Sequence, residues 1–244
     1  HGRSRDGRLL NPAFPYTSYT HVTREDSDAL WAYLRSLKPS TRTNTPHAMQ
    51  WPYGTQAALW AWRTLYFTPA GAASTRPAIQ DSQITRGQYL VQGLGHCTEC
   101  HAQRNVLGGL AKGAQGLGGV IPGSQWVAPS LYRSEESSVA GWATEDIQAF
   151  LRTGLTPRAI ASGPMAEVVL HGTQYLTEGD ATAMARYLKT LGPALSTATA
   201  PTASTTPAQS LHPTGRGAAL YDKHCAQCHG NAGEGYAKAY PALA

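Results

Sequence analysis

Every cysteine in this chain belongs to one short pattern that occurs twice, C-T-E-C-H at positions 97–101 and C-A-Q-C-H at 225–229. Two thiols separated by two residues can each form a thioether with one vinyl group of a porphyrin, and the adjoining histidine can bind the iron. A single Cys-x-x-Cys pair also occurs in disulfides, redox-active dithiols and zinc half-sites. Because both copies include the histidine, the pattern favours covalently attached haem c. The predicted attachment residues are Cys97, Cys100, Cys225 and Cys228.

The adjacent histidines, His101 and His229, are the predicted proximal iron ligands, which leaves the sixth coordination position to be found. Met165 is the predicted sixth ligand of the first haem, because it follows Ser-Gly-Pro in a turn sequence between two helices. The alternative is that Met165 fills a gap in the core. His171 is a rival ligand, although its place after three apolar residues indicates a surface histidine near a helix end.

Methionine and histidine together fill both axial positions of a haem iron and raise its reduction potential, which favours electron transfer over catalysis at an open iron. No residue is therefore predicted to be catalytic. Arg104 and Trp126 are candidates for binding the haem propionates, one as a charged donor and the other through its indole N–H. The alternatives are that Arg104 is a solvated surface residue and that Trp126 is an ordinary core residue.

Two repeats indicate how these residues are positioned. A helix is expected from Thr23 to about Leu37, with apolar residues at helical spacing, and the same pattern returns 154 residues later, from Thr177 to Pro193. A second repeat precedes the haem motifs, where R-G-Q-Y-L at 86–90 corresponds to R-G-A-A-L at 216–220. Further helices are expected at 85–94, from a cap at Thr144 to Gly154, and at 178–191. A Gly-rich loop at 108–123 is expected to wrap the cofactor.

Two segments rich in Ala, Ser, Thr and Pro, 70–82 and 194–213, have the composition of linkers. The segment 44–67 contains six aromatic residues and is expected to pack between units. With few strand signals, the sequence predicts an all-α fold of tandem domains whose cores centre on haem. The predicted order is the end of a first domain with an interdomain segment (1–69), a linker (70–82), a complete domain (83–193), a linker (194–213) and the beginning of a third domain (214–244).

Composition limits the classes of function. Of the 244 residues, 14% are charged and 41% hydrophobic, and the net charge of +5 is scattered without basic runs, which argues against nucleic acid as a partner. No apolar stretch is long enough to span a membrane, and the first residues lack the apolar core of a signal peptide. Because the repeat begins and stops in mid-domain, we expect a fragment whose export signal or membrane anchor lies beyond its ends.

The chain resembles the three-haem cytochrome c subunits of membrane-bound bacterial dehydrogenases for alcohols, aldehydes and gluconate. The matching strings are ALWAYLRSLKP (29–39), HCTECHAQRN (96–105), GWATEDIQAFLRTG (141–154), GPMAEV (163–168) and LYDKHCAQCHG (220–230). The resemblance implies tandem cytochrome c domains, Met165 as a sixth ligand and a third attachment motif upstream. It also implies a periplasmic subunit, not catalytic alone, that passes electrons from a catalytic dehydrogenase subunit to membrane ubiquinone or a terminal oxidase. Membrane association would reside in parts outside this chain.

One departure concerns the haem of the incomplete first domain, whose attachment motif is expected upstream of this chain. Many relatives have P-A-M-P-Y where this chain has P-A-F-P-Y at 12–16, and the phenylalanine, Phe14, cannot bind iron. Met49, His21 and His47 are weak substitutes. The variant is also similar to cytochromes that pair with molybdenum-dependent hydroxylases.

Two hypotheses of other classes stay open at this point. One is a haem enzyme such as a diheme peroxidase, which would need an open iron site. The other is a thiol or zinc protein without haem.

Overall fold

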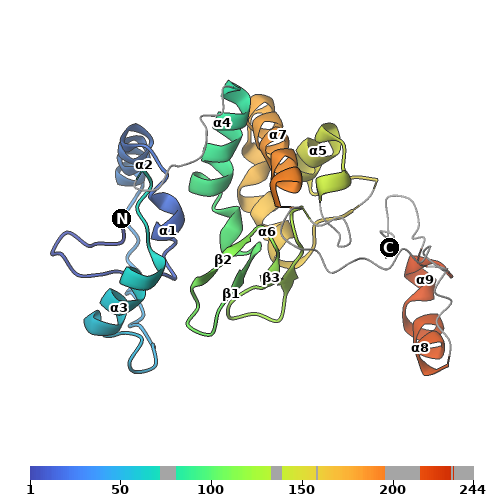
Figure 1. Cartoon of the computed structure of the whole chain (residues 1–244), viewed down its shortest axis with the longest axis horizontal. Helices are drawn as coiled ribbons and strands as arrows, with labels where there is room; N and C mark the ends of the chain where they lie inside the picture. The colour runs from blue at the N-terminus through green and yellow to red at the C-terminus, as the bar shows by residue number, and fades with distance from the viewer. Residues whose placement is uncertain (72–80, 133–138, 158, 196–214, 232, 234–244) are drawn as a thin grey trace. The chain divides into compact units, whose positions relative to one another are not determined.

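The computed structural model describes residues 1–71, 81–132, 139–157, 159–195, 215–231 and 233, and the chain divides into two compact units, His1–Ala128 and Pro129–Ala244. Both units are built mainly from helices (Figure 1). The all-α class is therefore confirmed. Within the described ranges, no helix has the length and apolar character needed to cross a bilayer.

The described residues of unit 1 form four α-helices, two short helical turns and two small antiparallel ladders. Its elements are α1 (Tyr16–Tyr19), α2 (Arg24–Ser36), α3 (Gln56–Tyr66), α4 (Ser82–Tyr89), η1 (Leu90–Leu94, a π-turn), η2 (Cys97–Glu99), β1 (Ala102–Arg104), β2 (Leu110–Gln115), β3 (Gly119–Val120) and β4 (Val127–Ala128). Strand β1 pairs with β2, and β3 with β4. The expected Gly-rich loop thus contains two short hairpins, in which glycines such as Gly113 adopt the positive φ of tight turns.

Unit 2 is formed around helices α5 and α7, which pack against each other. Its elements are η3 (Val139–Gly141), α5 (Thr144–Thr153), α6 (Gly163–His171), η4 (Thr173–Tyr175), α7 (Glu178–Leu195), α8 (Arg216–His224) and α9 (Ala226–His229). The α5–α7 core contains Ile147 and Leu151 on one side and Tyr187 and Leu188 on the other, all nearly inaccessible to solvent.

Several helix boundaries differ from the expectation. Helix α4 begins at Ser82, because the Asp81 carboxylate caps the N–H groups of Gln83 and Ile84. Thr144 does not cap α5 but is its first residue, after an N-cap at Ala143 with no side-chain hydrogen bond. Gly154 ends α5 in the left-handed region at φ 70°, as predicted. The predicted linkers lie mostly outside the described residues, and the proposed domain boundaries stay predictions.

The internal repeat is visible in the backbone of both units. Thr23 accepts the N–H of Asp26 at the start of α2, and Thr177 accepts that of Asp180 at the start of α7, at 3.2 and 3.1 Å. The repeat extends upstream of the helices. Gly2 and Gly154 have positive φ, and their carbonyls accept the N–H groups of Leu10 and Ala161, respectively, which closes an antiparallel bridge in each unit.

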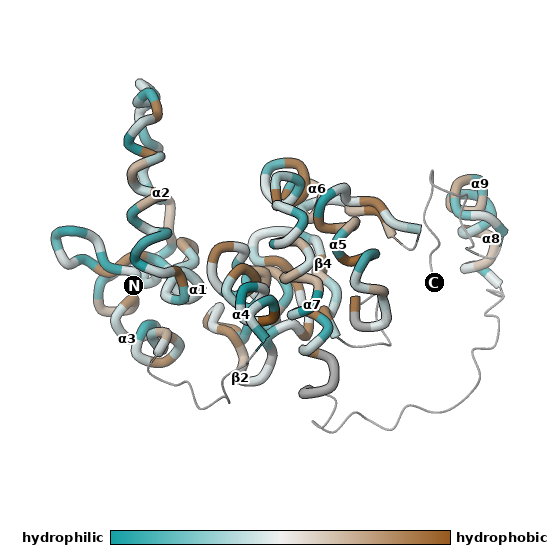
Figure 2. Tube along the Cα trace, turned by 90° about the horizontal axis from the view of Figure 1, so that it is seen from above, coloured by the Kyte–Doolittle hydropathy of each residue, from teal (hydrophilic) through white to brown (hydrophobic). Residues whose placement is uncertain are grey.

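The two copies of the repeated helix differ in burial. Tyr187 and Leu188 of α7 are 3% and 5% exposed, whereas the matching residues of α2, Tyr33 and Leu34, are 61% and 51% exposed. Helix α2 has no buried residue, although its apolar and polar residues have the spacing of an amphipathic helix (Figure 2). The same sequence pattern therefore yields a core helix in unit 2 and a surface helix in unit 1.

Candidate functional site

The two Cys-x-x-Cys-His segments fold into the same kind of turn. The carbonyl of Cys97 accepts the N–H groups of Cys100 and His101 at 3.3 and 2.9 Å. The carbonyl of Cys225 accepts those of Cys228 and His229 at 3.1 and 2.9 Å. Each motif thus holds two thiols and an imidazole within one helical turn. All four cysteines are free thiols in residues only partly accessible to solvent, which is the donor set that thioether attachment of haem c requires.

The backbone directly before the first motif has an unusual conformation. The π-turn η1 precedes it, and His96 lies in the left-handed region at φ 37°, which is rare for a residue other than glycine. The Tyr19 ring of α1 packs edge-on against His96, with 5.7 Å between the ring centroids. The chain therefore changes direction sharply just before Cys97, and α1 supports the turn.

Glu99, inside the first motif, is the centre of a nearly buried polar cluster. Its carboxylate accepts the hydroxyls of Thr17 and Ser18 from α1 at 3.0 and 2.8 Å. It also pairs with the Arg104 guanidinium at 2.5 Å, and the two side chains are only 14% and 18% exposed. These contacts join α1 to the motif across the predicted linker 70–82. We call Thr17, Ser18, Glu99 and Arg104 the Glu99 cluster.

Arg104 uses only part of its donor capacity within this cluster. Its two terminal nitrogens donate to the carbonyls of Gly108 and Glu99 and to the Glu99 carboxylate. Its Nε is buried and has no hydrogen-bond partner among the described residues. A buried guanidinium N–H without an acceptor is costly, and it fits the carboxylate of a haem propionate. Trp126 is half exposed, so the alternative of a core residue is wrong for it.

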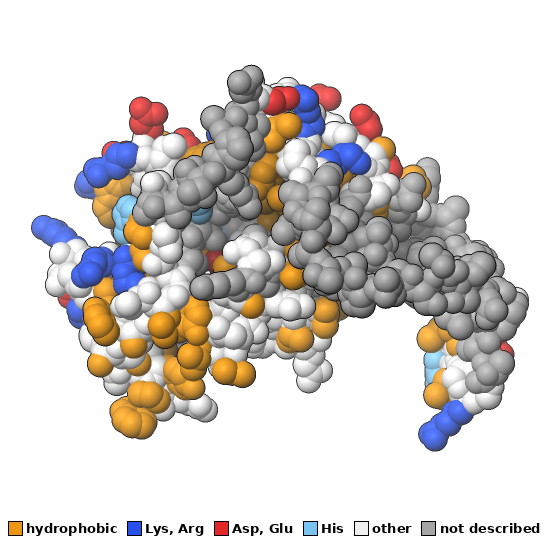
Figure 3. Space-filling view, viewed as in Figure 1, with side chains coloured by type: hydrophobic (Ala, Val, Ile, Leu, Met, Phe, Trp, Pro, Cys, Tyr) orange, Lys and Arg blue, Asp and Glu red, His pale blue; other side chains and the backbone are white. Residues whose placement is uncertain are grey.

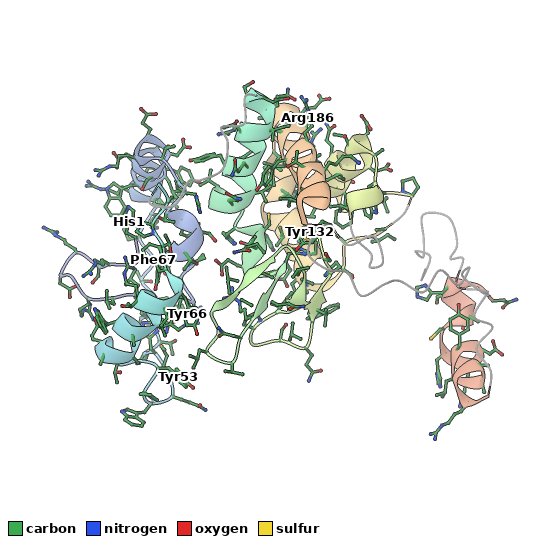
Figure 4. All side chains as sticks on the ribbon, in the orientation of Figure 1. His1, Tyr53, Tyr66, Phe67, Tyr132 and Arg186 are labelled. Carbon is green, nitrogen blue, oxygen red and sulfur yellow. The ribbon has the colours of Figure 1, made fainter. Side chains whose placement is uncertain are left out.

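Helix α3 supports the loop that follows the first motif. The Trp62 indole donates to the Leu107 carbonyl at 2.9 Å, and Asn105 donates to the Tyr66 hydroxyl at 3.1 Å. The Tyr66 ring lies directly against Gly109, where a β-carbon would overlap it. Figure 4 shows Tyr66 and Phe67 at the end of α3 that faces the rest of unit 1. Trp62, Tyr66 and Phe67 of the aromatic segment 44–67 are thus partly buried within unit 1, and the packing of this segment between units stays a prediction.

The first motif also changes the acidity of its thiols. Burial raises the pKa of the Cys97 thiol to about 11. Burial, together with the neighbouring Glu99 carboxylate, also raises the pKa of Cys100. In the protein without haem, both thiols are therefore held in the protonated form at neutral pH.

The second motif has much simpler surroundings. Cys225 joins α8 to α9, which contains the rest of the motif, and Gln227, which occupies the position of Glu99, is exposed. The Tyr221 hydroxyl donates to the Gly230 carbonyl at 2.6 Å and closes the turn after His229. Within the described residues, Gln227 therefore has none of the side-chain partners that Glu99 has in the first motif.

The remaining predicted ligands can be placed individually. Met165 lies half-buried in the first turn of α6, so the expectation that it stands outside a helix is wrong. His171 ends α6 and is exposed, as predicted. Met165 and His101 belong to different units, so their pairing on one iron stays a prediction. Among the described residues, no three His, Cys, Asp or Glu side chains gather as a metal site.

The internal repeat places Met165 at the position that corresponds to Phe14, the residue at which this chain differs from the family it resembles. In unit 1 the bridge Arg3–Leu9 is followed by Phe14 and α1, and in unit 2 the bridge Leu155–Ile160 is followed by Met165 at the start of α6. The two residues therefore occupy corresponding places after the same backbone element. Phe14 is 53% exposed, and Met49, His21 and His47 are exposed as well.

Sequence reasoning identified the thiols, the histidines and Arg104 but missed the partners of Glu99. Glu99 itself carried a signal, since it is an acidic residue inside a motif that otherwise contains only neutral side chains. Thr17 and Ser18 carried none, because their contact with Glu99 joins positions about eighty residues apart. Only the tertiary structure brings them together.

Comparison with known proteins agrees with this donor set. Residues 215–244 match the cytochrome c family. The cytochrome c subunit of a quinone-dependent alcohol dehydrogenase from Gluconacetobacter polyoxogenes is 36% identical, with 100% of this chain and 54% of the relative aligned. The gluconate 2-dehydrogenase cytochrome c subunit of Pantoea cypripedii is 35% identical over 94% of the chain and 54% of the relative. The fructose dehydrogenase cytochrome subunit of Gluconobacter japonicus is 33% identical, over 98% and 52%. The chain spans about half the length of these curated relatives.

Proposed function

Because this chain is related to the cytochrome c subunits of alcohol, gluconate and fructose dehydrogenases, we propose that it transfers electrons from a catalytic dehydrogenase subunit. The observation that carries the proposal is the pair of Cys-x-x-Cys-His turns, each with two free thiols and an imidazole in one turn. Haem c bound there exchanges single electrons between ferric and ferrous iron. The chain itself does not oxidise the substrate.

The residues of the chain have distinct tasks in this proposal. Cys97 and Cys100 would hold one porphyrin, Cys225 and Cys228 would hold another, and His101 and His229 would bind the two irons. The unused Nε of Arg104 would bind a haem propionate, and the Glu99 carboxylate holds the guanidinium through the 2.5 Å ion pair. Trp126 is the second proposed propionate donor.

Met165 is the proposed sixth ligand of the first haem. The repeat supports it, since Met165 occupies in unit 2 the place that Phe14 occupies in unit 1. A thioether and an imidazole together leave no open position on the iron, so the protein passes electrons without activating small ligands. The tandem cytochrome c domains predicted from the sequence, with 83–193 as the complete one, belong to the same proposal.

The proposed electron acceptor is membrane ubiquinone or a terminal oxidase, and the proposed location is the periplasm. Both follow from the resemblance to membrane-bound dehydrogenases. The relative from Gluconacetobacter polyoxogenes is named a quinone-dependent enzyme, which supports a quinone as the acceptor for that complex.

The test uses the full chain matured with haem. Mass spectrometry is expected to find covalent haem on peptides that contain Cys97 and Cys225, and the ferric spectrum is expected to be low-spin and unchanged by cyanide or peroxide. Anaerobic mixing with the catalytic subunit of the related alcohol dehydrogenase and an alcohol should reduce the haems, and a ubiquinone analogue should oxidise them again. Haem-free peptides, or haems that the catalytic subunit does not reduce, would refute the proposal.

The alternative of a diheme peroxidase is not favoured, because the similar proteins are cytochrome subunits of dehydrogenases. The same spectra test it. A high-spin ferric haem that turns over peroxide would support an enzyme and contradict Met165 as a ligand.

A further inference from the structure

Arg104, the charged residue that follows the first motif, is held in place by two helices, α1 and α3, that lie far from it in the sequence. In the part of unit 1 visible in Figure 3, charged side chains lie mainly along the left and upper margins, whereas hydrophobic side chains gather over α3. The Arg104 side chain differs from these marginal charges, because it is only 18% exposed. A nearly buried guanidinium needs fixed acceptors, and the residues that orient those acceptors determine how its remaining donor can be used.

Helix α1 acts on Arg104 through Glu99. The hydroxyls of Thr17 and Ser18 donate to one oxygen of the Glu99 carboxylate, Oε1, at 3.0 and 2.8 Å. The other oxygen, Oε2, accepts the Nη2 of Arg104. Because the two oxygens have separate partners, the hydroxyls fix the rotation of the carboxylate without competing with the guanidinium. Ser18 is only 4% exposed, so bulk water does not compete for this contact either.

Helix α3 acts on Arg104 from the other side, through the loop 105–109. The Nη1 of Arg104 donates to the Gly108 carbonyl at 2.9 Å. The Asn105 side chain closes this loop, because its oxygen accepts two backbone N–H groups of the loop. Its nitrogen donates to the Tyr66 hydroxyl of α3 at 3.1 Å, which anchors the loop to the helix. The second acceptor of the guanidinium is therefore positioned by α3.

We propose that Thr17, Ser18 and Tyr66 are positioning residues for Arg104 and thereby set the reduction potential of the haem on the first motif. This role rests on the proposed function, in which Arg104 binds a propionate of that haem. The contacts from α1 and α3 occupy the terminal nitrogens of the guanidinium, and its buried Nε has no hydrogen-bond partner among the described residues. A guanidinium kept beside a propionate offsets its negative charge, which otherwise stabilises ferric iron, so the potential rises.

The second motif provides a reference within the same chain. Gln227 stands in the place of Glu99, and Ala232 stands in the place of Arg104, so neither charge of the ion pair is present in that sequence. A change in α1 or α3 should therefore alter the potential of the first haem and leave that of the second unchanged. A general loosening of the protein would not make this distinction.

The test is a spectroelectrochemical titration of the full chain matured with both haems, and Cys225→Ala with Cys228→Ala assigns the two midpoint potentials. Thr17→Val combined with Ser18→Ala should lower the ferrous-to-ferric ratio of the first haem about threefold at a fixed applied potential, a shift of about 28 mV. Arg104→Gln should lower the ratio about tenfold, or about 59 mV. On the Arg104→Gln background, the two hydroxyl substitutions should cause no further change, because their effect passes through the guanidinium.

Tyr66→Phe tests the α3 side with less risk to folding, because it keeps the ring and removes only the hydroxyl that accepts from Asn105. It should lower the ratio about twofold, or about 18 mV. Thr17→Ser keeps the hydroxyl and should retain the original potential. Ser36→Ala is the matched control for Ser18→Ala, because the Ser36 hydroxyl also donates within the protein but lies on the exposed end of α2. Circular dichroism verifies that each variant is folded.

Three outcomes would overturn the proposal. One is that both haems shift equally, and another is that the hydroxyl substitutions shift the first haem as much on the Arg104→Gln background as on the original one. The third is that folded, haem-loaded variants of Thr17 with Ser18 and of Tyr66 keep the original potential. In each case the chain would still carry covalent haem that the catalytic subunit reduces, so the proposed function would stand. Its own failure is recognised separately, by chains without covalent haem or by haems that the catalytic subunit does not reduce.

Discussion

The two Cys-x-x-Cys-His turns have the same backbone hydrogen bonds but differ in the residues that surround them. Around 97–101, a hydroxyl pair from α1, a nearly buried ion pair and a strained His96 all contact the motif. Around 225–229, the described contacts are the packing of α8 on α9 and the Tyr221 hydroxyl on Gly230. The five-residue motif alone therefore sets the local turn, whereas the neighbouring elements set how polar and how buried its surroundings are.

The largest expected effect tests whether the two motifs act independently. Cys97→Ala with Cys100→Ala should remove one covalent haem, and Cys225→Ala with Cys228→Ala should remove the other, because each motif holds its own porphyrin. Pyridine haemochrome absorbance per chain should fall by about half in either variant. A loss of both haems from one double substitution would show that the two motifs are coupled.

The next effect concerns the middle residue of each motif. Glu99→Ala leaves the Arg104 guanidinium nearly buried without its carboxylate, which should destabilise unit 1 by about 3–5 kcal/mol. Gln227→Ala, at the matching exposed position, should change stability by less than about 0.5 kcal/mol. Five of the six tryptophans lie in unit 1, so urea unfolding followed by tryptophan fluorescence reports on it.

Glu99→Gln separates charge from hydrogen bonding in the same cluster. The amide oxygen can still accept from Thr17 and Ser18, so this variant should fall between Glu99→Ala and the unchanged protein. If Glu99→Ala were as mild as Gln227→Ala, the Glu99 cluster would not be what distinguishes the two motifs.

A third effect concerns pH in the protein before haem attachment. Because burial raises the pKa of Cys97 from 9.0 to about 11, its thiolate fraction at pH 8 should be about a hundredfold below that of an unperturbed thiol. Iodoacetamide should therefore modify Cys97 slowly at pH 8 and progressively faster up to pH 11. Peptide mass spectrometry follows the reaction, and urea-unfolded protein is the control. Equal rates in folded and unfolded protein would contradict the burial of this thiol.

The smallest effect tests the link between α1 and the first motif. Ser18 is only 4% exposed, and its hydroxyl donates to a nearly buried carboxylate. Ser18→Ala should cost about 1.5–3 kcal/mol, because a hydrogen bond to a charged group is lost without leaving space for water. Ser36→Ala on the exposed end of α2 is the control, with an expected change under about 0.5 kcal/mol. Urea unfolding measures both, and equal effects would mean that α1 does not stabilise the motif.

The sequence by itself determined the local features of this protein. The Cys-x-x-Cys-His pattern needs only one helical turn, so its geometry follows from adjacent residues. Threonine caps at Thr23 and Thr177 and the glycine stop at Gly154 likewise depend on neighbours three or four positions away, and the structure confirms them. The fold class followed from the same short-range signals.

The tertiary structure alone determined which side chains are buried and which residues far apart in the sequence meet. Tyr33 and Tyr187 have equivalent places in one repeated pattern, yet one is exposed and the other is buried, because α7 packs along α5 with its Tyr187 side. Thr17, Ser18 and Arg104 converge on Glu99 because α1 and β1 meet at the motif, which no spacing along the chain encodes. Local hydrogen bonds are set by sequence neighbours, whereas burial depends on which surfaces meet when distant segments pack.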